Sequence, residues 1–333
     1  MKKRYRIVMC LGLAAIVIGS LAAMGIGRFF IAPHDVIRLL LGRPTVSNAA
    51  IILWNVRLPR ICMSVLAGAG LAAAGLAFQS LFANPLATPD TLGTAQGASF
   101  GAALGILFGW KAGYIQVLAM LCGIMAVFLV LLVTSSLSKG DRRFIIAVIL
   151  AGMVISSLFS SLVSLMKYIA DPQDQLPAIT FWLMGGFSGV TRRSLFFAAP
   201  VILGGIVLLF ALRFRLNALS LSEEEAVSLG TSLPLLRMLV ILSASAITAS
   251  IVAICGVIGW VGLLVPHMAR MLVGNDVRRC MPASIVLGGL FLLGVDTVAR
   301  TAASAEIPVS VLTAVIGAPV FILLLRKTGG IQT

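Results

Sequence analysis

The chain has 333 residues, of which 60% are hydrophobic and only 11% are charged, and its formal net charge is +14. A soluble domain carries about 25% charged residues, so this composition excludes a soluble protein and indicates an integral membrane protein. Lys and Arg accumulate in the cytoplasmic loops of membrane proteins. The positive charge is therefore read as a topology signal, and nucleic acid is not expected as a partner.

Apolar runs predict an all-α, polytopic protein with ten membrane-spanning helices in a single transmembrane domain over residues 1–333. The basic start of the chain is typical of a signal peptide, but the apolar run after it is long enough to span, so we expect a retained first helix. The eighth span is short and interrupted by Pro266. The predicted spans are 7–27, 58–82, 92–109, 114–137, 144–169, 194–213, 237–256, 259–272, 281–301 and 308–326.

Ten spans put both chain ends on the same side of the membrane. When that side is the cytoplasm, most of the 25 Lys and Arg residues fall inside, which supports a multi-pass protein with both termini cytoplasmic. Arg57, Arg60 and Arg300 then lie on the outer side near helix ends, against the usual distribution of positive charge.

The stretch that follows Arg57 is rich in Ala and Gly and is then broken by a polar loop. Gly68, Gly70 and Gly75 would let other helices approach the backbone of the second span closely. The break at Asn84-Pro85-Leu86 cannot face lipid, because its freed backbone groups would go unsatisfied there. We expect this loop to lie at the membrane surface or to line a cavity.

Two further polar segments stand out. The outer segment 171–193 holds a short amphipathic piece, Ala178–Gly186, which suits either a surface helix or a helix at the mouth of a pathway. The inner segment 217–236 has a capping box at Ser222 and Glu225 that predicts a short helix. Its acidic first turn, Glu223 and Glu224, suits a helix N-terminus. Gly230 can end this helix, and Pro234 can start the next one. The segment is either a solvated loop or a docking helix, and a compact acidic helix favours docking.

The remaining ionisable residues narrow the function. Asp296 and Arg300 are four residues apart and can pair on one helix face. No acidic residue falls at mid-span, which disfavours an ion-coupled secondary transporter. His34 and His267 lie in separate segments and make neither a metal site nor a catalytic base. The sequence shows no polar cluster of the kind that a membrane enzyme would need for catalysis. No GxxxxGK[ST] phosphate loop is present, so ATP, if used, would be bound by another chain.

The chain resembles, over nearly its whole length, the FecCD-type permease subunits of type II ABC importers for iron-siderophores, haem and cobalamin. The resemblance rests on several motifs in the family's order. They are RLPR at 57–60, GLAFQSLFANPLATPDTLG at 75–93, FWLMGGFSG at 181–189, LSLSEEEAVSLG at 219–230, VGLLVPHMARMLVGNDVRR at 261–279, DTVAR at 296–300 and EIPVSVLTAVIGAPVF at 306–321.

The resemblance implies ten helices per subunit and an assembly of two permease subunits, identical or paralogous, with two cytoplasmic ATPases and an outer substrate-binding protein. This binding protein would be periplasmic or lipid-anchored. The permease would lie in a bacterial or archaeal plasma (inner) membrane, in contact with lipid. It would bind no cofactor, and the partner ATPase would hydrolyse ATP. The expected cargo is a metal chelate, iron-siderophore first, with haem, cobalamin or molybdate as alternatives.

The resemblance also implies roles for particular positions. Arg57, Arg60 and Arg300 match sockets for acidic residues of the binding protein, and Asn84 and Leu86 match a cytoplasmic gate. The segment 219–230 matches the coupling helices that contact the ATPase, with Ser222, Glu223, Glu224, Glu225 and Gly230 as its marked residues. The chain departs from the family at two places. The family has a second gate at the start of the fifth helix that can be polar, and the sequence of that region here is FIIAVILAG. Ser310 replaces a glycine of the family's EIPVG motif.

Overall fold

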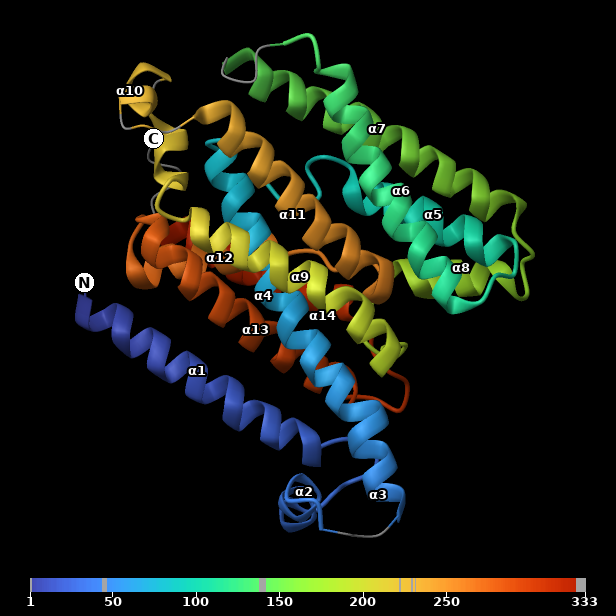
Figure 1. Cartoon of the computed structure of the whole chain (residues 1–333). Coiled ribbons are helices and arrows are strands. Elements are labelled where there is room, and N and C mark those ends of the chain that lie inside the picture. Colours follow the sequence, from blue (N-terminus) through green and yellow to red (C-terminus); the bar gives the residue numbers. More distant parts are fainter. Residues whose placement is uncertain are drawn as a thin grey trace.

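The computed structural model describes residues 2–43, 47–137, 142–221, 223–228, 230 and 232–327, and these residues form helices and turns without a strand. Seven of the described helices are long and apolar enough to cross a membrane, and with three shorter ones they make ten helices that fall in the ten predicted spans (Figure 1). They are α1 (Lys2–Gly25), α4 (Leu58–Leu81), α5 (Thr94–Leu107), α6 (Ala112–Val133), α7 (Arg142–Ile169), α9 (Arg192–Leu212), α11 (Leu233–Cys255), α12 (Val261–Val273), α13 (Val277–Ala299) and α14 (Val309–Lys327).

Short helices connect these spans at the two ends of the bundle. α2 (Pro33–Leu40), α3 (Ser47–Ile51) and the π-helical stretch η1 (Ile52–Arg57) lie between α1 and α4. α8 (Gln175–Leu183) precedes α9, and a 3-10 turn η2 (Leu216–Ser220) and α10 (Glu223–Ser228) lie between α9 and α11. In Figure 1, α10 and the start of α1 lie toward one end, whereas α2, α3 and α8 lie toward the other.

The second span is the centre of the bundle. α4 is 83% buried over its most apolar window and packs against α9, α11, α12 and α13. Its glycines allow this approach, because an added Cβ at Gly68 would lie 2.0 Å from the Gly288 carbonyl oxygen of α13. A Cβ at Gly75 would lie 2.0 Å from the Gly262 carbonyl oxygen of α12. The prediction that small residues let helices pack backbone to backbone is confirmed.

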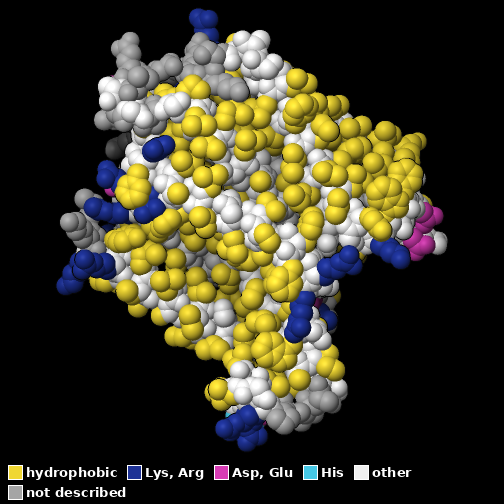
Figure 2. Space-filling model, viewed as in Figure 1, with side chains coloured by type: hydrophobic (Ala, Val, Ile, Leu, Met, Phe, Trp, Pro, Cys, Tyr) yellow, Lys and Arg dark blue, Asp and Glu magenta, His cyan; other side chains and the backbone are white. Residues whose placement is uncertain are grey.

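The peripheral helices leave most of their apolar surface uncovered within this chain. The most apolar windows of α6, α7 and α9 are each 28% buried, and that of α1 is 17% buried. Figure 2 shows hydrophobic side chains over much of the visible face, with Lys and Arg gathered toward its edges. This is the surface expected of a protein whose solvent is lipid.

Two local details differ from the sequence-based expectation. The eighth span is not interrupted by Pro266, since α12 runs continuously from Val261 to Val273 with this proline inside it. The entry to the second span is longer than predicted, because η1 joins α3 to α4 as one apolar helical stretch from Asn48 to Leu81.

Candidate functional site

The three arginines that depart from the usual charge distribution come together at one end of the bundle. Arg57 ends η1, where the Leu58 N–H bonds the Leu53 carbonyl oxygen five residues back and widens the turn. The Arg57 guanidinium donates to the carbonyl oxygens of Met24 and Phe29, at and after the end of α1. Arg57 therefore joins α1, the first span, to the start of α4, the second span.

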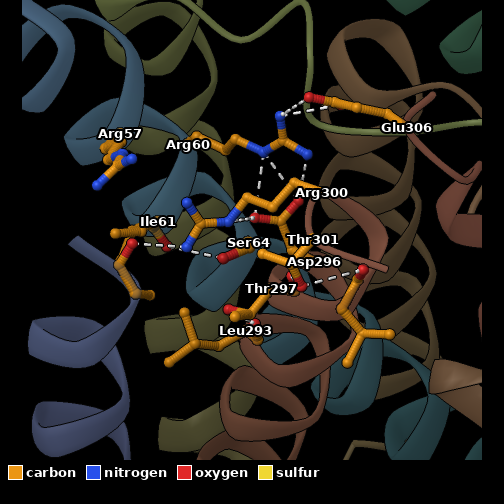
Figure 3. Close-up of polar contacts among 12 residues, drawn as sticks. Arg57, Arg60, Ile61, Ser64, Leu293, Asp296, Thr297, Arg300, Thr301 and Glu306 are labelled. Atoms are coloured by element: carbon orange, nitrogen blue, oxygen red, sulfur yellow. Dashed lines mark hydrogen bonds and ion pairs between the residues drawn. The ribbon is translucent and has the colours of Figure 1, made fainter. Parts of the chain in front are cut away.

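Arg60, one turn later on α4, lies between two carboxylates (Figure 3). Its Nε is 2.9 Å from Asp296 Oδ1, and its Nη2 is 2.8 Å from the same oxygen. Its Nη1 donates to both Glu306 oxygens, at 2.9 and 3.0 Å. Bidentate contacts of this kind are the strong form of a charge pair. Sequence reasoning missed both pairs, because the partners lie 236 and 246 residues away.

Arg300 completes the cluster from the end of α13. It donates to the Ala23 carbonyl oxygen at 2.6 Å, and its Nε lies 3.9 Å from Asp296 Oδ2. The predicted pairing of Asp296 with Arg300 is therefore present, but it is a longer contact than the pair between Asp296 and Arg60. We call Arg57, Arg60, Arg300, Asp296 and Glu306 the outer charge cluster, after the side of the membrane on which the sequence predicts the three arginines.

The outer charge cluster is largely shielded from solvent in this chain. Arg57, Arg60 and Arg300 are 5, 7 and 6% exposed, and Asp296 is fully buried. The Glu306 side chain is the accessible member, with 33% of its surface exposed. Three arginines and two carboxylates leave one net positive charge. Removing a buried partner such as Asp296 would leave an uncompensated charge, which is strongly destabilising.

The loop after α4 forms a second polar site. Asn84 Oδ1 accepts from the Leu86 N–H at 2.9 Å, and both residues are exposed. They line a cavity of about 460 Å³ with Asp90, Thr91 and side chains of α7. The expectation that this loop lies at the surface or lines a cavity is confirmed. The gate role of Asn84 and Leu86 stays a prediction.

Asp90 is a member of this loop that sequence reasoning did not select. Its Oδ1 accepts from the Ala95 N–H at 2.7 Å, at the start of α5. Burial raises the pKa of this carboxyl to about 6, although backbone N–H groups of Ala95 and Gln96 oppose that shift. The signal available in the sequence was an acidic residue shortly before a small-residue helix.

The inner segment forms the helix that the sequence predicted. α10 spans Glu223–Ser228, and α11 starts at Leu233 with Pro234 in its first turn. Gly230 has a φ of +71°, the left-handed conformation that favours glycine after a helix. Ser222 lies outside the described residues, so its cap is not observed. Nearby, Asn217 of η2 donates to Asp276 Oδ1 at 3.0 Å and ties this segment to the start of α13.

The amphipathic piece of the outer segment also forms a helix, α8. Its end is joined to two spans, because the Gly186 N–H donates to the Cys255 carbonyl oxygen at 2.7 Å and the Val309 N–H to that of Gly185 at 3.0 Å. Ser310 Oγ donates to the Met184 carbonyl oxygen at 2.5 Å. The serine that departs from the family pattern therefore bonds the start of α14 to the end of α8.

This chain matches the model of the FecCD transport family over residues 15–327. It belongs to that family. The molybdate import system permease protein of Haemophilus influenzae is 41% identical over 317 residues, which cover 94% of this chain and 93% of that protein. A protein of Helicobacter pylori described as a probable iron chelatin transport system permease is 36% identical, and the match covers 86% of each chain.

A solved structure has the same fold. It is described as a putative metal-chelate type ABC transporter in an inward-facing conformation, is 38% identical and matches with a TM-score of 0.86 over 96% of this chain and 99% of that one. The sequence-based assignment to this family and fold is confirmed. The chain is a multi-pass membrane permease of the metal-chelate ABC importer type and not an enzyme.

Proposed function

We propose that the chain works with a second permease subunit, two cytoplasmic ABC ATPases and an outer substrate-binding protein, in a bacterial or archaeal plasma membrane with both termini cytoplasmic. The match to a metal-chelate transporter over 96% of the chain supports this proposal. The sequence has no phosphate loop of its own, so the ATPase would supply the energy. Co-expression with its partner ATPase and binding protein should give a stable complex whose ATP hydrolysis rises when the loaded binding protein is added. A permease that purifies alone and never alters ATP hydrolysis would argue against it.

The outer charge cluster is the proposed docking site for the binding protein. Arginine suits carboxylate partners because its planar fork can bind two oxygens. In this chain the arginines already have partners, so an incoming carboxylate must join or displace one of them. Glu306 is the accessible partner, with one third of its side chain exposed. We propose that a carboxylate of the binding protein competes with Glu306 for Arg60.

Replacing all three arginines with glutamate would be a poor test of docking. It would place three new carboxylates beside Asp296 and Glu306, and an unpaired buried charge costs about 3–5 kcal/mol. The variant should therefore fail to fold before it fails to dock. The single change Glu306→Gln avoids this ambiguity, because it adds no carboxylate to the cluster.

The segment 217–236, with α10 at its centre, is the proposed contact with the ATPase. A short acidic helix in a chain with only 11 acidic residues supports this assignment. Replacing Glu224 and Glu225 with lysine should lower the yield of ATPase that co-purifies, because rim charges set association. The permease itself should elute and melt as the unmodified chain does. Co-purification at full yield would remove this segment from the ATPase interface.

The proposed cargo is a metal oxyanion of the molybdate class or an iron chelate. The molybdate relative, at 41% identity over 94% of this chain, favours the oxyanion. The iron chelatin relative, at 36% over 86%, supports the iron-siderophore that the sequence put first. Elemental analysis of the partner binding protein, purified from cells grown with both metals, should find molybdenum for the first cargo and iron for the second. Cobalt, or haem seen by its absorbance, would select an alternative.

A further inference from the structure

A strongly basic pocket opens at the end of the bundle where α1 begins, away from the outer charge cluster. It has a volume of about 380 Å³ and is lined by side chains of α1, of the end of α9 and of the start of α13. Four of the lining residues are arginines, and no described acidic residue lines it. We call it the basic pocket. The arginines are Arg6, Arg213, Arg278 and Arg279.

Few of these positive charges are neutralised within the described part of the chain. Asp276, beside the basic pocket, is 3.3 Å from Arg278 Nε. Neither Arg6 nor Arg279 makes a side-chain hydrogen bond or salt bridge with a described residue. Four arginines and one neighbouring carboxylate leave three net positive charges. Such a concentration of like charge favours an anionic ligand.

Two of the arginines also lie at the unfavourable end of a helix. Arg278 and Arg279 are in the first turn of the 23-residue helix α13, where the helix dipole favours negative charge. A bound anion would offset both the dipole and the arginines. Basic residues are in general excess on this side of the protein. The pocket differs from that background because its four arginines converge on one cavity.

Arg213 is held in place by aromatic rings. Its guanidinium carbon lies 3.8 Å from the centre of the Phe210 ring and 4.3 Å from that of Phe214. It also donates to the Phe210 carbonyl oxygen at 2.6 Å. These contacts fix the cation without neutralising it. A pre-positioned arginine loses little freedom when a ligand binds.

A groove without polar surface adjoins the basic pocket and shares Phe210 and Pro282 with it. Along each of α1, α9 and α13, the side chains change from basic or aromatic ones at the pocket to apolar ones at the groove. The change takes about one helical turn, a rise of about 5.4 Å. The helix α1 passes from Arg6 to Met9, for example. The other groove residues are Ile206, Val207, Ile285 and Val286.

We propose that the basic pocket and its groove bind an anionic phospholipid, with the phosphate among the arginines and an acyl chain in the groove. Basic pockets between spanning helices on the cytoplasmic side suit such headgroups. A free phosphate would use the arginines but leave the groove without a role. Three net positive charges also suit the two phosphates of cardiolipin better than the single phosphate of phosphatidylglycerol.

The test uses the full chain, purified in a mild detergent, with binding of cardiolipin, phosphatidylglycerol and phosphatidylcholine measured by native mass spectrometry. The order of affinity should follow the lipid charge, with cardiolipin tightest. Arg279→Gln should weaken cardiolipin binding about fivefold, and Arg6→Gln with Arg279→Gln about thirtyfold, as expected for one and two basic residues near an anionic headgroup. Arg215→Gln is the matched control: this exposed arginine lies two residues after Arg213 and does not line the pocket, so its effect should stay within about twofold.

Three results would overturn the proposal. The first is equal binding of the three lipids, and the second is equal behaviour of the pocket variants and the control variant. The third is displacement of cardiolipin by inorganic phosphate at equal concentration, which would indicate a free-anion site. A second measurement needs no variant: a photoreactive cardiolipin added to the unmodified chain should label peptides of α1, α9 and α13. Labelling confined to other helices would also contradict the site.

Discussion

The contact of α4 with α13 through Gly68 and Gly288 predicts a large effect of one added methyl group. A Cβ at Gly288 would lie 2.3 Å from the Gly68 carbonyl oxygen and 2.7 Å from the Ala72 Cβ. Ordinary contacts between carbon and a carbonyl oxygen are about 3.3–3.6 Å, so the two backbones would have to separate by about 1 Å. Gly294 lies on the same helix with nothing within 4 Å of the added atom, and it provides the matched control.

Gly288→Ala should destabilise the chain by about 1–3 kcal/mol, the usual cost of overpacking. Gly294→Ala should stabilise it by up to about 1 kcal/mol, because alanine is the better helix former. The two variants should therefore differ by about 1–4 kcal/mol. Unfolding by SDS in mixed micelles, followed by circular dichroism, measures this difference. Equal stabilities would mean that the close packing of α4 and α13 does not limit the fold.

Three further predictions concern the polar sites. Asp90→Asn should stabilise the chain at pH 8 by up to about 3 kcal/mol, because the raised pKa of Asp90 makes wild-type stability fall as the pH rises from about 4 to above 6. An equal gain in melting temperature at pH 4 and pH 8 would contradict this. Glu306→Gln should tighten docking of the binding protein several-fold, measured with the complex in nanodiscs, because it removes one of the two carboxylates that pair with Arg60 and leaves the Asp296 pair in place; weaker docking would show that Glu306 organises the cluster instead of competing. Cysteines at Asn84 or Leu86, with the native cysteines replaced, should crosslink two permease subunits to an extent that changes with ATP, and no crosslink in any nucleotide state would place this loop away from the subunit axis.

The sequence predicted the helices better than the contacts between them. Apolar runs about 20 residues long must become helices in lipid, and even the short spans α5 and α12 lie where apolar runs predicted them. The break in α12 was wrongly expected at Pro266, because a proline can be accommodated where neighbouring helices and local adjustments satisfy the freed backbone groups. The π-helical stretch η1, Ile52–Arg57, which leads directly into α4, left no signal in the residue pattern.

The candidate site was predicted only in part. The charge anomaly found Arg57, Arg60 and Arg300, and the structure brings them together. Their carboxylate partners could not be assigned, because helix register and tertiary packing decide which distant groups meet. Asp90 was missed for a similar reason: its burial depends on how the loop folds onto α5, which no local pattern encodes.

The measurement that tests the account most directly is uptake into proteoliposomes that contain the permease, with the partner ATPase and loaded binding protein added in turn. We predict that metal uptake requires ATP and all three proteins, and that it continues when proton and sodium gradients are dissipated. Uptake by the permease alone, driven by an imposed ion gradient and indifferent to ATP, would contradict the assignment to an ATP-driven importer.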